Sequence, residues 1–117
     1  IGNSHGKYKG VPKLDFDRLA TLRDTVSVPL VLHGGSGLSP DDFRHTIKLG
    51  IAKVNFFTGM SQAVLAALKD GIADTTIAAK YDHYLFLMQR ARQDIAKAVA
   101  EQIEIFGSVG KAASYDN

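Results

Sequence analysis

The chain has 117 residues, of which 45% are hydrophobic and 22% are charged, and its formal net charge is +2. These values fit one globular domain, and the scattered basic residues give no nucleic-acid-binding face. No apolar run approaches the ~20 residues of a membrane span, so we expect no membrane partner. Cysteine is absent, which excludes disulfides, thiolate metal ligands and a cysteine nucleophile, and we expect a cytoplasmic location.

The first half of the chain predicts a strand end, a helix and a strand. Residues 1–6, "IGNSHG", are typical of the end of a strand, and because the chain starts at Ile1 rather than Met we interpret it as part of a longer protein. Asp15 is a good N-cap for a helix to about Val26. The stretch "VSVPLVLH" then predicts a strand with apolar residues on both faces, as in a parallel sheet.

The second half predicts two helices around another short strand, then a long closing helix. Ser39, Pro40 and Asp42 form a capping-box pattern, and Gly50 ends that helix before the strand "IAKVNFF". A helix from about Thr58 into the seventies and another over 85–106 follow, and the poorly patterned residues 71–84 should contain the connection between them. The tail after Gly107 is expected to be frayed. Their expected buried stripes are Met60, Val64, Leu68 and Ile72, and Met88, Ala91, Ile95, Val99 and Ile103.

Alternating strands and helices with short connections predict an α/β fold with a parallel sheet. In such folds the carboxyl ends of the strands meet at one rim, which is where barrel active sites form. The segments 2–6, 32–37 and 54–59 are all strand ends, so their polar residues should converge.

Two of these strand ends carry a His-Gly pair, about one βα repeat apart. Neutral imidazoles on neighbouring strands suit zinc, although a catalytic site needs a third protein ligand. The alternative is that His5 and His33 each make an ordinary backbone hydrogen bond.

The glycines after His33 suit a phosphate, because they let backbone N–H groups approach an anion and Ser36 adds a hydroxyl donor. Thr58 begins a helix whose free N–H groups also attract anions. A flexible turn and an ordinary helix start are the alternatives. Asn55 could bond a ligand or simply cap a turn.

The stretches "IGNSHGKYKGVPKLDFDRL", "VPLVLHGGSG", "GIAKVNFFT" and "IFGSVGKA" resemble, in order and spacing, the C-terminal part of class II, zinc-dependent fructose-bisphosphate and tagatose-bisphosphate aldolases. The resemblance implies the C-terminal portion of a TIM (β/α)₈ barrel, with the end of strand 6, strands 7 and 8 and the closing helices. Residues 1–117 would then belong to a single barrel domain.

The resemblance also implies roles for individual residues. His5 and His33 would bind Zn²⁺, and Gly6 would contact dihydroxyacetone phosphate through its backbone. The substrate and its near phosphate would be held by Gly34, Gly35, Ser36, Asn55 and Thr58. Arg92, with Arg90 as an alternative, would bind the far phosphate. Phe56 and Phe57 replace smaller residues usual in the family, which leaves the exact sugar open.

The implied activity is reversible aldol cleavage of a ketose 1,6-bisphosphate, fructose or tagatose, to dihydroxyacetone phosphate and glyceraldehyde 3-phosphate. The third zinc histidine and the acid/base aspartate of the family have no counterpart here and are expected upstream of Ile1, so the chain by itself should be catalytically incomplete. We expect a homo-oligomer, a dimer or tetramer. Two alternatives remain: a non-catalytic phosphosugar-binding barrel fragment, and a barrel part that only completes a partner chain.

Overall fold

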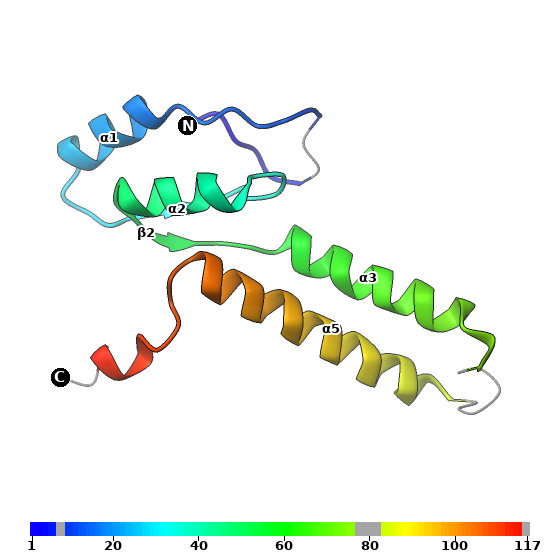
Figure 1. Ribbon diagram of the computed structural model, residues 1–117. Helices are drawn as coiled ribbons and strands as arrows, with labels where there is room; N and C mark the ends of the chain where they lie inside the picture. Colours follow the sequence, from blue (N-terminus) through cyan, green and yellow to red (C-terminus); the bar gives the residue numbers. More distant parts are fainter. Residues whose placement is uncertain (7–8, 77–82, 116–117) are drawn as a thin grey trace. The chain divides into compact units, whose positions relative to one another are not determined.

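The computed structural model describes residues 1–6, 9–76 and 83–115. It divides into two units, which we call the strand unit, Ile1–Phe57 with Ile103–Asn117, and the helical unit, Thr58–Gln102. The elements in chain order are α1 (Phe16–Thr25), β1 (Leu30–Leu32), α2 (Pro40–Lys48), β2 (Ile51–Val54), α3 (Thr58–Ala73), α5 (Tyr84–Ile105) and the short 3₁₀ helix η1 (Ala112–Tyr115) (Figure 1).

Side-chain caps define the two helices of the strand unit, as predicted. The Asp15 carboxylate accepts a hydrogen bond from the Arg18 N–H at 2.9 Å, which satisfies one free donor at the start of α1. At α2, the Ser39 hydroxyl and the Asp42 carboxylate each accept from the other residue's backbone N–H, a complete capping box. Gly50 follows α2 with φ +106°, a conformation that favours glycine and turns the chain into β2.

The predicted parallel pairing is confirmed for β1 and β2, in which Leu32 lies opposite Val54. β1 is shorter than the expected "VSVPLVLH" strand and is not buried on both faces, because Val31 keeps 42% of its surface exposed. Within the described residues β2 is the only strand paired with β1. The predicted strand end at 1–6 is also wrong in form, since those residues make no ladder.

The core of the strand unit lies between the strand pair and its helices. It contains Leu19, only 1% exposed, together with Leu32, Phe43 and Ile51. The ring of Phe43 packs edge-on against Phe56 and Phe106, with centroids 6.1 and 5.1 Å away. Burying side chains of this size stabilises a fold by roughly 1.5–3 kcal/mol each.

The end of α5 is closed by a Schellman motif, in which the N–H groups of Gly107 and Ser108 donate to the carbonyls of Glu104 and Ile103. The helix therefore stops at Gly107, as the sequence predicts. The expected frayed tail is wrong for Ala112–Tyr115, which form η1. A hydrogen bond from the Ser114 N–H to the Lys111 carbonyl, 3.1 Å long, holds this turn.

In the helical unit, α3 and α5 run side by side (Figure 1). A Cβ built on Gly71 would lie 2.8 Å from a methyl carbon of Leu87, so the helices approach closely at this glycine. The predicted stripes are only partly correct, because Ile72 is 69% exposed and the buried residues are Ala67, Gly71 and Ala91. The predicted connection within 71–84 is confirmed, because α3 ends at Ala73 and α5 begins at Tyr84. Residues 77–82 lie outside the described part.

Among the described residues, no helix combines the length and apolarity that crossing a bilayer demands.

Candidate functional site

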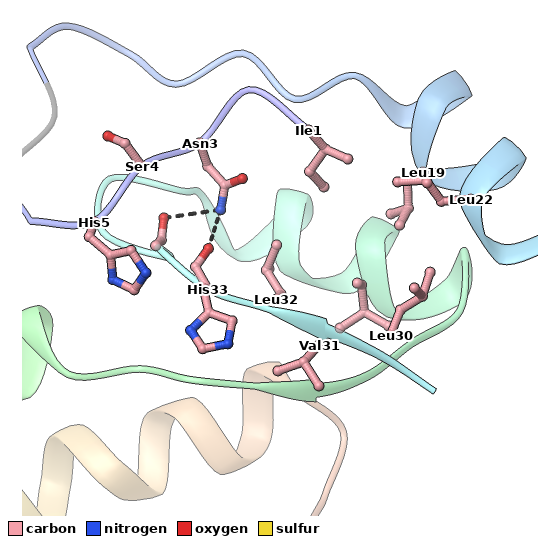
Figure 2. A pocket seen from close by; sticks show the side chains of 12 residues that line it. Ile1, Asn3, Ser4, His5, Leu19, Leu22, Leu30, Val31, Leu32 and His33 are labelled. Carbon is pink, nitrogen blue, oxygen red and sulfur yellow. Dashed lines mark hydrogen bonds between the residues drawn. The ribbon is translucent and has the colours of Figure 1, made fainter. Parts of the chain in front are cut away.

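Two histidines from separate segments face each other in the strand unit. His33 directly follows β1, and His5 lies in the irregular segment 1–6. Their ring centroids are 5.5 Å apart, with the ring planes inclined by 55°, and both side chains are exposed (Figure 2). The expected convergence of these two segments is thus confirmed.

Asn55 joins this pair from the end of β2. Its backbone N–H donates to the Leu32 carbonyl at 2.9 Å, which continues the parallel pairing beyond the last strand residue. Its side-chain nitrogen lies 3.1 and 3.2 Å from the two ring nitrogens of His33, and the ring nitrogen that carries no proton can accept a hydrogen bond from it. His5, His33 and Asn55 therefore form one polar cluster, and we call it the histidine cluster.

Asn3 is a residue of this region that the sequence analysis did not select. Its side-chain amide donates to the backbone carbonyls of His33 and of Gly34, the second at 3.3 Å (Figure 2). The sequence carries no signal for this role, because it depends on which backbone carbonyls the fold brings to the half-buried amide.

The glycines after His33 have packing reasons of their own. Gly34 has φ +68°, and a Cβ there would lie 2.5 Å from the carbonyl oxygen of Ser4. At Gly35 a Cβ would meet the Phe43 ring at 3.0 Å, and the Gly35 carbonyl accepts from the Leu38 N–H. The glycine content therefore follows from local packing, whether or not an anion binds.

The same loop nevertheless presents free donors. Among the described residues, the backbone N–H groups of Gly34, Gly35 and Ser36 and the Ser36 hydroxyl make no hydrogen bond. Successive free N–H groups in a turn form a concavity that suits anions.

A cavity of about 290 Å³ lies beside the histidine cluster. Its polar end is formed by Asn3, Ser4, His5, His33 and Gly34, and its walls are aliphatic (Figure 2). The wall residues are Ile1, Leu19, Leu22, Leu30, Val31, Leu32 and Ile51.

The remaining predicted site residues are less tightly placed. Gly6 is exposed with φ +80° and has no atom within 4 Å of a built Cβ. Thr58 begins α3 and Arg92 is exposed on α5, both in the helical unit. In that unit Arg90 lies 3.9 Å from Asp74, whereas Arg92 has no partner among the described residues.

Comparison with known proteins identifies the family of this chain. Residues 1–111 match the family model described as "Fructose-bisphosphate aldolase class-II". The chain belongs to the class II fructose-bisphosphate aldolase family.

Similar proteins agree with this aldolase assignment. The protein YdjI of Escherichia coli K12, described as uncharacterized, is 42% identical over 112 residues, which are 96% of this chain and 37% of YdjI. The crystal structure of the YdjI aldolase superposes with a TM-score of 0.83 and covers 96% of this chain and 39% of its own. A putative fructose-1,6-biphosphate aldolase from Coccidioides immitis reaches the same TM-score at 27% identity, over 96% of this chain and 38% of its own.

A fructose-bisphosphate aldolase from Campylobacter jejuni, only 18% identical, shares the fold with a TM-score of 0.72, over 91% of this chain and 38% of its own. The chain thus spans less than two fifths of the length of these relatives. Its α/β architecture is that of part of an aldolase, a family of lyases whose fold is a TIM barrel.

The donor set of the histidine cluster suits zinc in kind but is incomplete in number. His5 and His33 offer two imidazoles, whereas catalytic zinc usually has three protein ligands. Over residues 1–6, 9–76 and 83–115, no group of three or more His, Cys, Asp or Glu side chains is placed to hold a metal. The aldolase chain described here can therefore supply two ligands.

Proposed function

We propose that this protein catalyses the reversible aldol cleavage of a ketose 1,6-bisphosphate, fructose or tagatose, to dihydroxyacetone phosphate and glyceraldehyde 3-phosphate. Residues 1–117 would form the end of strand 6, strands 7 and 8 and the closing helices of a single (β/α)₈ barrel domain. The observation that carries the proposal is the histidine cluster of an aldolase-family chain. In it, His33 and Asn55 directly follow two parallel strands, and the His5 ring faces His33.

In this proposal His5 and His33 hold a Zn²⁺ ion, with a third histidine from a part of the protein outside residues 1–117. When bound, the ion supplies Lewis-acid polarisation of the substrate carbonyl. The aspartate that moves the proton is likewise placed outside this chain.

Asn55 is proposed to orient the substrate. Its amide faces the ring nitrogens of His33, and those lone pairs are the ones a metal needs. With His33 serving as a metal ligand, the Asn55 amide would be free to donate to a hydroxyl or carbonyl oxygen of the sugar. An oriented donor of this kind holds the reacting carbons in register.

The loop after His33 is proposed to bind the phosphate of the dihydroxyacetone half. The free N–H groups of Gly34, Gly35 and Ser36, together with the Ser36 hydroxyl, support this role. Two further contacts belong to the same proposal. Gly6 would use its backbone, and Thr58 would act with the free N–H groups at the start of α3.

For the far phosphate we favour Arg92 over Arg90. Asp74 stands 3.9 Å from the Arg90 guanidinium, and Arg90 also packs against Gly71. Arg92 lies two residues further along α5, where it is exposed and its charge is available for an anion.

The experiment is an aldolase assay on the full-length protein that contains this chain. Fructose and tagatose 1,6-bisphosphate are supplied separately, and release of dihydroxyacetone phosphate is followed by its NADH-dependent reduction with an added glycerol phosphate dehydrogenase. We expect activity with at least one of them, lost on chelation and restored by Zn²⁺. Activity that survives the chelator and is trapped by borohydride would instead identify a lysine Schiff base and overturn the proposal.

A second candidate is a non-catalytic phosphosugar-binding protein, which is favoured because His5 and His33 are joined by no third metal-ligating side chain among the described residues. Calorimetric titration with dihydroxyacetone phosphate, with and without Zn²⁺, separates the two functions. Binding that is independent of metal, in a protein that cleaves neither bisphosphate, would favour this alternative.

A further inference from the structure

We propose that Asn3 is a positioning residue that sets the separation and tilt of the His5 and His33 rings. This inference rests on the proposed metal-binding role of those two histidines and deepens it. Asn3 does not touch the rings, and it acts through the two backbone segments that carry them.

The segment that carries His5 is not fixed by a strand ladder. Among the described residues, its Ile1 carbonyl accepts from the Asp15 N–H at 3.0 Å, well before the histidine. Nearer to His5, the side chain of Asn3 bonds the carbonyls of His33 and Gly34. One amide therefore ties the irregular segment to the residue that directly follows β1.

Three successive residues of this segment meet the loop after β1. Asn3 bonds its carbonyls, Ser4 places its carbonyl oxygen where a Cβ of Gly34 would be, and the His5 ring faces His33 with centroids 5.5 Å apart (Figure 2). A shift of the Asn3 hydrogen bonds would therefore move the His5 ring, which is only two residues away along the chain. The absence of a side chain at Gly34 is what allows this close approach.

The chemistry of the contact requires an amide. An asparagine side chain has two N–H donors, and here both acceptors are backbone carbonyls of adjacent residues. A carboxylate at residue 3 would point negative oxygens at those carbonyls, and alanine would leave them without these donors. Because Asn3 is half-buried, water replaces the lost bonds only in part.

The test uses the full-length protein with Asn3→Asp, Asn3→Ala and Asn3→Gln. Gln89→Glu, which converts an exposed amide of α5 to an acid, is the matched control. Nuclear Overhauser contacts between the ring protons of His5 and His33 are measured in metal-free protein. Zn²⁺ affinity is then measured by competition with a chelating dye, followed by kcat and KM.

We expect Asn3→Asp and Asn3→Ala to lose the contact between the rings and to bind Zn²⁺ about 10–100-fold more weakly, as is typical for residues that orient metal ligands. The kcat should fall with little change in KM for the phosphosugar. Asn3→Gln keeps the donors and should recover part of each property, and it carries the test if the other variants fail to fold. Gln89→Glu should match the wild type.

The inference is overturned if Asn3→Asp or Asn3→Ala keeps the wild-type ring contact, or, where neither of these variants folds, if Asn3→Gln recovers none of it. That result stands whether or not the protein binds zinc. A wild-type protein that neither binds Zn²⁺ nor cleaves a ketose bisphosphate would contradict the proposed function instead, so the two failures are distinguishable.

Discussion

The ends of β1 and β2 and the pair of helices α3 and α5 are held by different kinds of contact. At the strand ends, the side-chain amides of Asn3 and Asn55 bond backbone carbonyls and the His33 ring, respectively. Replacing such an amide donor by a carboxylate acceptor is enough to break the hydrogen bond. Between the helices, the close approach depends on Gly71 having no side chain. Substitutions that remove polar groups of the strand unit should therefore lower activity, and substitutions that add side-chain volume between α3 and α5 should lower stability.

The largest expected effect comes from removing a proposed ligand at the strand ends. His33→Ala in the full-length protein should lower kcat/KM by at least about a hundredfold, because loss of a ligand exceeds the usual cost of losing the groups that orient it. Metal analysis of the purified protein should show loss of zinc. His45→Ala is the matched control, since that exposed ring stacks on Phe16, with centroids 4.1 Å apart, and not on the histidine cluster. Unchanged zinc content in His33→Ala would refute the ligand assignment.

In the helical unit, Gly71→Val should lower the free energy of unfolding by roughly 1–3 kcal/mol, because the added carbons overlap Leu87. Denaturant unfolding of the full-length protein measures this change. Lys69→Val places the same branched side chain at an exposed position of α3 and should cost at most about 0.7 kcal/mol in helix propensity. Equal losses in the two variants would mean that the contact at Gly71 is not tight.

A milder change at the strand ends should separate binding from chemistry. Ser36→Ala removes one proposed phosphate donor, so KM should rise about tenfold with kcat nearly unchanged, as expected for a hydrogen bond to a charged group. Steady-state kinetics with the preferred bisphosphate measure both constants. Ser108→Ala, an exposed serine of the other end of the chain, should leave both unchanged. An unaltered KM in Ser36→Ala would argue against the phosphate role.

The smallest expected effect tests the two arginines of α5. Arg92→Met should raise KM for the bisphosphate about fivefold, the size of a partly exposed ion pair, without changing KM for the corresponding ketose 1-phosphate. Arg90→Met should leave both KM values near wild type, because Arg90 already lies beside Asp74. The reverse result would assign the far phosphate to Arg90.

The parts of the fold that the sequence predicts well are those determined by local chemistry. Asp15 and Ser39 cap their helices because their side chains reach backbone N–H groups three residues ahead. Gly107 ends α5 because only a residue that tolerates positive φ can close the Schellman motif. Each of these features depends on a few neighbouring residues.

The parts that were predicted poorly depend on contacts distant in sequence. The exposure of Val31 depends on what packs over its face of β1, and nothing in "VSVPLVLH" specifies that. The stripe containing Ile72 was chosen for large apolar residues, whereas α3 and α5 approach at a glycine. Within the candidate site, His5, His33 and Asn55 could be brought together from the spacing of strand ends, but Asn3 could not, because its role depends on which carbonyls face it.

The aromatic cluster of Phe43, Phe56 and Phe106 has a consequence for the order in which the protein matures. Gly35 lies against the ring of Phe43. That ring packs against Phe56, which follows β2, and Phe106, which directly follows α5. During synthesis, Phe106 leaves the ribosome after every other residue of this cluster. The loop proposed to bind phosphate should therefore reach its final conformation only after Phe106 has packed against Phe43. In a nascent chain truncated before Phe106, the Phe43 ring under Gly35 would lack one of its aromatic packing partners.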